Sequence, residues 1–295
     1  MNKLILADLF LFIVTIGWGL TYLMTKTLVM EIPPFMILWV RFLFASIIFS
    51  VIFFKKIQLI STKLLHRSLF CGFILWLAFV TQIFGIQYST PGKAGVITGL
   101  FIIFVPILYF LLEKKMLSIS TLFATILSFF GLLLFSYHST EKLALKKEDF
   151  ILVSSAFFYA LHIIYIDKTY EDFPNPNIYT FILIQMIVII FLSFLPSIYL
   201  EKKPASISIN SYIGLIYNIL IGTILAYTAQ TVVQKYSPPT HVSLIMSFES
   251  VFAYLFSWIF YGEEITWNNI LGVLFILTGI FLTGILDVKV RHSNQ

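Results

Sequence analysis

Two charged residues of this chain stand inside long apolar stretches, where a charge is costly. Glu249 lies in "SLIMSFESVFAYLF" and Arg41 lies in "FMILWVRFLFASIIF". Because an ionised carboxylate is unfavourable in apolar surroundings, Glu249 could take up and release a proton, or it could stay protonated as a hydrogen-bonded structural residue. Arg41 cannot discharge by losing its proton and therefore needs an acceptor. It could pair with Glu249, hold a substrate carboxylate, or bond backbone carbonyls, and we favour the structural or counter-ion role.

Three amide side chains also lie in apolar stretches. Gln82, Asn218 and Gln230 each offer hydrogen-bond donors and an acceptor, which suits a polar or zwitterionic solute without the cost of a full charge. The alternative is that these amides join neighbouring helices by hydrogen bonds. Both roles stay open at this stage.

Aromatic residues and a histidine complete the set of candidate site residues. Trp18 and Tyr22 are four residues apart and share one face of a helix, although such pairs often serve packing. His162 could titrate near neutral pH or be a hydrogen-bonded packing residue. The candidate substrate-binding residues are therefore Trp18, Tyr22, Gln82, Tyr88, His162, Asn218, Gln230 and Glu249, with Glu249 as the candidate for proton coupling.

The composition places all these residues in a membrane. Of 295 residues, 59% are apolar and only 11% are charged, and 32 are Phe. A membrane-spanning helix needs about 20 apolar residues, and the apolar runs do not alternate with a period of two as barrel strands do. An all-α integral membrane protein with ten transmembrane helices is predicted, with spans at Leu4–Met30, Pro34–Phe54, Ser68–Gln87, Ala94–Leu112, Thr121–Tyr137, Phe150–Ile166, Ile178–Leu200, Tyr212–Gln234, His241–Tyr261 and Asn268–Leu286.

Several other classes of protein are disfavoured. The longest polar breaks hold about a dozen residues and leave no room for a nucleotide-binding domain, and "PGKAG" lacks the flanking residues of a phosphate-binding loop. Cys71 is the one cysteine, and no cluster has metal-ligand spacing, so no cofactor or metal is expected. The aromatic residues lie in lipid-type stretches, which is not typical of nucleic-acid binding. The first apolar run is too long for a cleaved secretion signal and is expected to be retained.

The basic residues favour one orientation in the membrane. Counted over alternate loops, eleven Lys and Arg residues fall on the side of the two termini and seven on the other side. By the positive-inside rule both termini are predicted to be cytoplasmic, in the cytoplasmic (inner) membrane.

The chain repeats itself at an offset of 148 residues. "YSTPGKAG" begins at Tyr88 and "YSPPTHVS" at Tyr236, and the same offset pairs Gln82 with Gln230. Each half, 1–140 and 141–295, would hold five spans, and an odd number forces the second half to enter the membrane from the opposite face. The sequence therefore predicts two inverted five-helix repeats, an architecture typical of secondary transporters.

Small residues recur at the same offset. Gly95 and Gly99 in the fourth span correspond to Ser243 and Ser247 in the ninth, and small residues four apart let helices approach closely. We predict that these two helices pack on each other beside the cavity and that their contact changes as access alternates.

The chain also resembles a known family. "WGLTYLMTK" followed by a proline corner and "RFLFA" is similar to the first repeat of EamA-type members of the drug/metabolite transporter superfamily. "TQIFGIQYSTPGKAGVITGLFIIFVPILYFLL" and "AYTAQTVVQKYSPPTHVSLIMSFESVFAYLFSWIFYGEEIT" look like that family's third-to-fourth and eighth-to-ninth helices. One departure is Ser250, where the family usually has a proline after the acidic residue. The sequence therefore does not decide whether the helix is kinked beside Glu249.

The resemblance covers essentially the whole chain. It implies ten helices, a cavity lined mainly by helices one, three, four, six, eight and nine, and transport of small metabolites, frequently outward and often of amino acids or related solutes. It does not imply a particular substrate.

The leading hypothesis is a secondary transporter, an exporter of small organic metabolites driven by a proton or solute gradient. An uncoupled facilitator or channel is the first alternative. An intramembrane enzyme is the second, but Glu249 has no clear catalytic partner. Gly131, Gly272 and Gly279 could support helix contacts within one chain or in a homodimer.

Overall fold

The computed structural model describes residues 3–114, 118–136 and 147–279, and within these ranges it contains helices and no strand. In chain order the helices are α1 (Lys3–Val29), α2 (Pro34–Phe53), α3 (Thr62–Tyr88), α4 (Pro91–Thr98), α5 (Phe101–Glu113), α6 (Ile119–Ser136), α7 (Lys147–Asp172), α8 (Ile178–Leu200), α9 (Ile209–Ile219), the π-helix η1 (Leu220–Leu225), α10 (Ala226–Gln234), α11 (Pro239–Met246), α12 (Phe248–Tyr261) and a last helix, Trp267–Gly279.

Eight helical segments of the described residues are long and apolar enough to cross a membrane. They are α1, α2, α3, α4 with α5, α7, α8, α9 with η1 and α10, and α11 with α12. The remaining apolar helices, α6 and Trp267–Gly279, are shorter by this criterion. Part of the predicted tenth span, residues 280–286, and the end of the fifth at Tyr137 lie outside the described residues.

Several helices begin earlier than the apolar runs predict, because polar residues cap them. Ser61 accepts a hydrogen bond from Leu64 N, so α3 begins at Thr62 and not at Ser68. Thr90 accepts one from Lys93 N, and α4 begins at the proline that follows it rather than at Ala94. Hydropathy alone does not mark these polar first turns.

Two predicted spans are interrupted at equivalent positions. The fourth span breaks at Gly99, between α4 and α5, and the ninth breaks at Ser247, between α11 and α12. Both residues have the shallow ψ of a tight turn, −12° and −16°. At the second break Ser250 N donates to Ser247 O at 3.1 Å, three residues back. A helix interruption therefore lies beside Glu249 although no proline follows it.

A third irregularity is η1, which joins α9 to α10. The wider turn is held by Thr223, whose hydroxyl donates to Asn218 O, five residues back, at 2.8 Å. π-helical turns are rare and often lie at functional sites.

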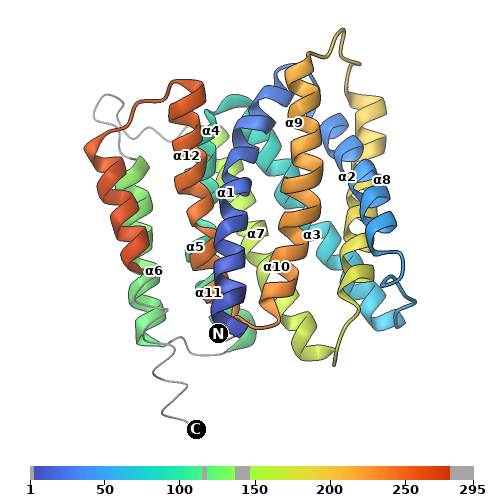
Figure 1. Cartoon of the computed structure of the whole chain (residues 1–295), viewed down its shortest axis with the longest axis horizontal. Helices are drawn as coiled ribbons and strands as arrows, with labels where there is room; N and C mark the ends of the chain where they lie inside the picture. The colour runs from blue at the N-terminus through green and yellow to red at the C-terminus, as the bar shows by residue number, and fades with distance from the viewer. Residues whose placement is uncertain (1–2, 115–117, 137–146, 280–295) are drawn as a thin grey trace.

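The helices form one layered bundle (Figure 1). α2 and α8 pack together at one end of it, and α6 stands beside the helix Trp267–Gly279 at the other. α1 contacts α9, α10 and α12 across the chain, while α7 contacts α3, α4 and α5. Figure 1 also places α4 near one end of the bundle axis and α11 near the other.

The glycines of the outermost helix pair lie against each other within the chain. A Cβ on Gly131 would approach Gly272 O to 2.7 Å, and one on Gly279 would meet Ser128. These small residues thus allow α6 and the helix Trp267–Gly279 to approach closely.

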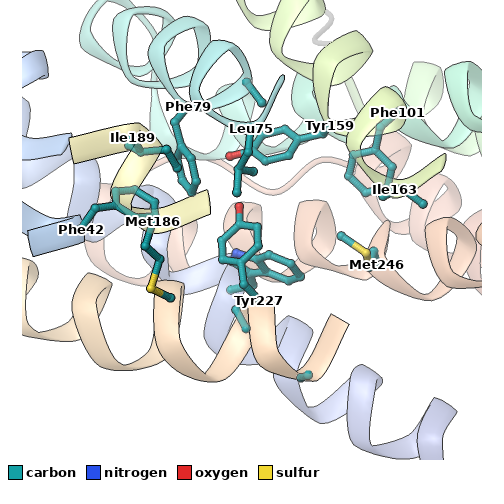
Figure 2. Packing of buried hydrophobic residues seen from close by; sticks show 14 of the residues in the cluster. Phe42, Leu75, Phe79, Phe101, Tyr159, Ile163, Met186, Ile189, Tyr227 and Met246 are labelled. Atoms are coloured by element: carbon teal, nitrogen blue, oxygen red, sulfur yellow. The ribbon is translucent and has the colours of Figure 1, made fainter. Parts of the chain in front are cut away.

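Aromatic residues fill the centre of the bundle (Figure 2). The ring of Phe79 lies 5.0 Å from that of Phe42, 5.8 Å from that of Tyr159 and 5.6 Å from that of Tyr227, measured between centroids. Trp18 packs edge-on against Tyr227 at 5.5 Å. This cluster is drawn from five helices, and three of its residues, Trp18, Phe79 and Tyr159, line the site described next.

Candidate functional site

A small polar cavity lies in the middle of the bundle. Its volume is about 20 Å³, which is room for about one water molecule, so the cavity is closed to a metabolite-sized solute in this conformation. The lining residues come from both halves of the sequence and are Trp18, Thr21, Tyr22 and Thr25 of α1, Arg41 of α2, Phe79, Gln82 and Ile86 of α3, Phe101 of α5, Tyr159 of α7, Met246 of α11 and Glu249 of α12.

Glu249 lies at one end of a chain of hydrogen bonds in this cavity. Tyr22 Oη donates to Glu249 Oε1 at 3.0 Å, and Gln82 Nε2 donates to Tyr22 Oη at 3.1 Å. Tyr159 Oη in turn donates to Gln82 Oε1 at 3.0 Å. Glu249 is only 5% exposed and belongs to the first turn of α12, directly after the interruption at Ser247. The carboxylate therefore faces partners and open space rather than lipid.

Arg41 lines the same cavity and is held by η1. Its Nε donates to Thr223 Oγ1 at 2.7 Å and its Nη2 donates to Gly222 O at 3.0 Å. The guanidinium also lies over the ring of Phe79, 4.9 Å from the centroid. These two bonds use two of five N–H donors. Within the described residues neither Arg41 nor Glu249 is in an ion pair, so the pairing considered for them from the sequence is absent from this conformation.

Asn218 supports the cavity from behind its wall. Thr25, which lines the cavity, donates from its hydroxyl to Asn218 Oδ1 at 3.3 Å, and Asn218 Nδ2 donates to Gly214 O at 2.9 Å. Lys26 lies nearby and donates to the last carbonyls of α3, at Ile86 and Gln87. A cation is favourable at that helix end.

His162 and Gln230 lie outside this cavity. His162 is 1% exposed, and its Nε2 lies 2.7 Å from Gln185 Oε1, in a separate small pocket lined by α2, α3, α7, α8 and α10. Gln230 Nε2 donates to Gln234 Oε1 at 3.2 Å, and Gln234 Nε2 donates to Ile163 O at 2.8 Å. In this conformation Gln230 thus contributes to the contact between α10 and α7, while its sequence equivalent faces the cavity.

The remaining sequence candidates are placed at the ends of helices and at their contacts. Tyr88 is 64% exposed at the end of α3 and is not brought to the cavity. Gly95 and Gly99 of α4 lie against Ala253 and Ser250 of α12, and Ser250 Oγ donates to Gly95 O at 2.9 Å.

The two serines equivalent to these glycines are buried and bond within α11. Ser243 donates to Thr240 O and Ser247 to Leu244 O, at 2.8 and 2.7 Å.

Tyr159, Phe79 and the support for Arg41 from η1 were not singled out from the sequence. Tyr159 is one of 15 tyrosines, and no spacing distinguishes it from the others. Thr223 and Gly222 follow Asn218 closely, but only the wider turn of η1 places them beside α2. Among the described residues no group of three potential metal ligands comes together.

Comparison with known proteins gives one family for the whole chain. The model of the EamA-like transporter family matches residues 5–137 and again residues 146–285. A solved crystal structure superposes with a TM-score of 0.78 over 96% of this chain and 98% of that one, at 12% sequence identity, which shows a shared fold.

Two relatives carry transporter names. An uncharacterized transporter of Archaeoglobus fulgidus is 26% identical over 283 residues, covering 96% of this chain and 87% of the relative. The uncharacterized transporter YoaV of Bacillus subtilis is 24% identical over 278 residues, covering 91% of this chain and 93% of the relative. These matches indicate a transporter rather than an enzyme. The chain belongs to the EamA-like transporter family, within the drug/metabolite transporter superfamily, and is a multi-pass membrane protein.

Proposed function

We propose that this protein is a secondary transporter that exports small organic metabolites, amino acids or related solutes, across the cytoplasmic membrane. The observation that carries the proposal is that an acid and a guanidinium, Glu249 and Arg41, line one buried cavity without an ion pair between them. Charged groups are expensive in a membrane unless they find partners or face a cavity, and both of these groups face the same one.

The arrangement suits a zwitterion. The carboxylate of an amino acid can accept hydrogen bonds from the planar guanidinium of Arg41, whose three remaining donors have no partner among the described residues. The ammonium group of the amino acid can be held by the ionised carboxylate of Glu249, and Trp18 and Phe79 offer an apolar wall for the side chain of the solute. A proton and the ammonium group then compete for Glu249, which couples export of the solute to entry of a proton.

The mechanism that we propose is alternating access between two inverted halves, 1–140 and 141–295, with ten spans in total and both termini in the cytoplasm. One ion pair and one histidine–carboxylate contact support this symmetry. Lys93, the third residue of α4, lies 2.8 Å from Asp149 Oδ1 near the start of α7. His241, at the equivalent place in α11, lies 3.0 Å from Asp8 Oδ2 in α1.

Each of these pairs joins one half of the chain to the other, and the helices α4 and α11 lie at opposite ends of the bundle (Figure 1). Both pairs are present together with the narrow cavity. We infer that this conformation is closed at both faces and that each pair separates when its own face opens.

Transport assays with the purified protein in liposomes test the proposal. The liposomes are loaded with amino acids, nucleosides or amines, and efflux is measured with and without an inward proton gradient. Efflux of one or more zwitterionic solutes that the gradient accelerates is expected. Flux that ignores pH and does not saturate would favour the uncoupled facilitator, and flux of amines alone would contradict the role given to Arg41.

A further inference from the structure

Tyr159 lies at the far end of the hydrogen-bond chain that ends on Glu249. The donors of all three bonds point the same way, from Tyr159 to Gln82, from Gln82 to Tyr22, and from Tyr22 to Glu249, over 3.0, 3.1 and 3.0 Å. A glutamine amide can accept at one end and donate at the other, which lets the side chain of Gln82 pass this direction on.

A series of hydrogen bonds donated in this direction favours the ionised form of the Glu249 carboxylate. Hydrogen bonds donated to a carboxylate stabilise its charge, and linked bonds polarise one another in the same sense. A protonated Glu249 can still accept from Tyr22 through its carbonyl oxygen, but a neutral acceptor gains less from donated hydrogen bonds than a carboxylate does.

We propose that Tyr159 is a positioning residue that, through Gln82 and Tyr22, determines how readily Glu249 takes up its proton. The inference rests on the proposed role of Glu249 as the proton site. Tyr159 and Glu249 belong to the second half of the chain and the two residues between them to the first half, so the chain of bonds crosses between the halves twice. A movement of the halves that separates Tyr159 from Gln82 therefore changes proton binding at Glu249, which links access to proton uptake.

The other titratable and charged groups around Glu249 are few. Tyr22 faces it from α1, Arg41 from α2 and Tyr159 from α7, all lining the same cavity. Tyr227 of α10 packs edge-on against Trp18, and it also interacts electrostatically with Tyr159 and with Glu249. The lining residues from α5 and α11, Phe101 and Met246, carry no titratable group. Arg41 is anchored on η1, so removal of the Tyr159 hydroxyl leaves this nearby cation in place.

The variant Tyr159→Phe tests the inference, because it removes the hydroxyl and keeps the ring that packs on Phe79 at 5.8 Å. The full chain in lipid nanodiscs is titrated by infrared spectroscopy, and the band of the protonated Glu249 carboxyl is identified by its absence in Glu249→Gln. Tyr159→Phe is expected to move the midpoint of this band to higher pH by roughly half a pH unit. Gln82→Leu, which breaks the next bond, should move it in the same direction.

Tyr170→Phe is the matched control. Tyr170 is also on α7, and its hydroxyl donates to Thr231 O of α10 at 2.7 Å, away from the cavity. This variant loses one tyrosine hydrogen bond between helices, as Tyr159→Phe does, and its midpoint should equal that of the wild type.

The outcomes separate the two proposals. A Glu249 carboxyl that does not titrate removes both the proton site and this inference. A carboxyl that titrates with the same midpoint in wild type and Tyr159→Phe removes the inference alone. Equal shifts in Tyr159→Phe and Tyr170→Phe would also overturn it, because the effect would then come from a general loosening of α7.

Discussion

Gly99, directly after α4, lies against Ser250 of α12, so closely that a Cβ on Gly99 would meet the hydroxyl of Ser250. The same serine bonds to Gly95 O, one turn earlier. The two interrupted spans of the bundle thus touch through their smallest residues, beside the cavity that holds Glu249 and Tyr22.

A larger side chain at this contact should obstruct the transport cycle. Gly99→Leu is expected to insert into the membrane normally and to lower solute flux roughly tenfold or more, since overpacking a tight contact costs about 1–3 kcal/mol. Flux in liposomes and the amount of monodisperse protein measure the two effects. Ile107→Leu, at a 48% exposed position on α5, is the control. Flux kinetics of Gly99→Leu that match the wild type would refute this role of the contact.

Substitution of Arg41 should discriminate between solutes. Arg41→Lys keeps the charge but loses the planar set of donors, so the apparent affinity for solutes with a carboxylate should fall about tenfold. Amines without a carboxylate should be affected much less. Competition assays with a transported amino acid and its decarboxylated analogue provide the comparison. An equal loss for both compounds would show that Arg41 serves the fold alone.

The ion pair between Lys93 and Asp149 should hold the closed conformation. Asp149 is 1% exposed, so Lys93→Met removes one charged partner of a buried carboxylate and should lower the midpoint of thermal unfolding. The exchanged double variant, Lys93→Asp with Asp149→Lys, should recover part of the loss. The pairing would be contradicted if the decrease in this midpoint in the double variant were larger than the decreases in Lys93→Asp and Asp149→Lys added together.

The orientation of the two turns that follow Tyr88 and Tyr236 can be tested with the single cysteine removed. Cys71 is buried, so Cys71→Ser gives a background without accessible thiols. Tyr88→Cys and Tyr236→Cys then each add one thiol at an exposed position. Membrane-impermeant reagents should label the first from outside the cell and the second only after the membrane is opened. Labelling of both from one side would contradict the inverted halves.

The sequence predicted the helices better than their irregularities. Long apolar runs are what a membrane requires, so the spans could be located from hydropathy. Gly99 and Ser247 were identified from the sequence as small packing residues, but no proline stands at either break, and the helix interruptions there were not predicted.

The cavity could be predicted only in part. Glu249, Arg41, Gln82, Trp18 and Tyr22 lie in it, and each was singled out by its chemistry.

Gln230 and Gln82 are equivalent in sequence, and for both the sequence left a substrate-binding and a helix-joining role open. Gln230 follows η1, however, and a wider turn changes the direction of the residues after it relative to those before. Tyr159 could not be identified without the fold, because its role depends on one acceptor on another helix.

Proton movement in liposomes tests the central claim most directly. An outward solute gradient is applied at equal pH on both sides, and the pH of the lumen is followed for the wild type and for Glu249→Gln. The wild type should move protons in the direction opposite to the solute. Glu249→Gln has no carboxylate to take up or release a proton, so it should show either solute flux without proton movement or no solute flux. Proton movement in Glu249→Gln equal to that of the wild type would contradict the assignment of Glu249 as the coupling site.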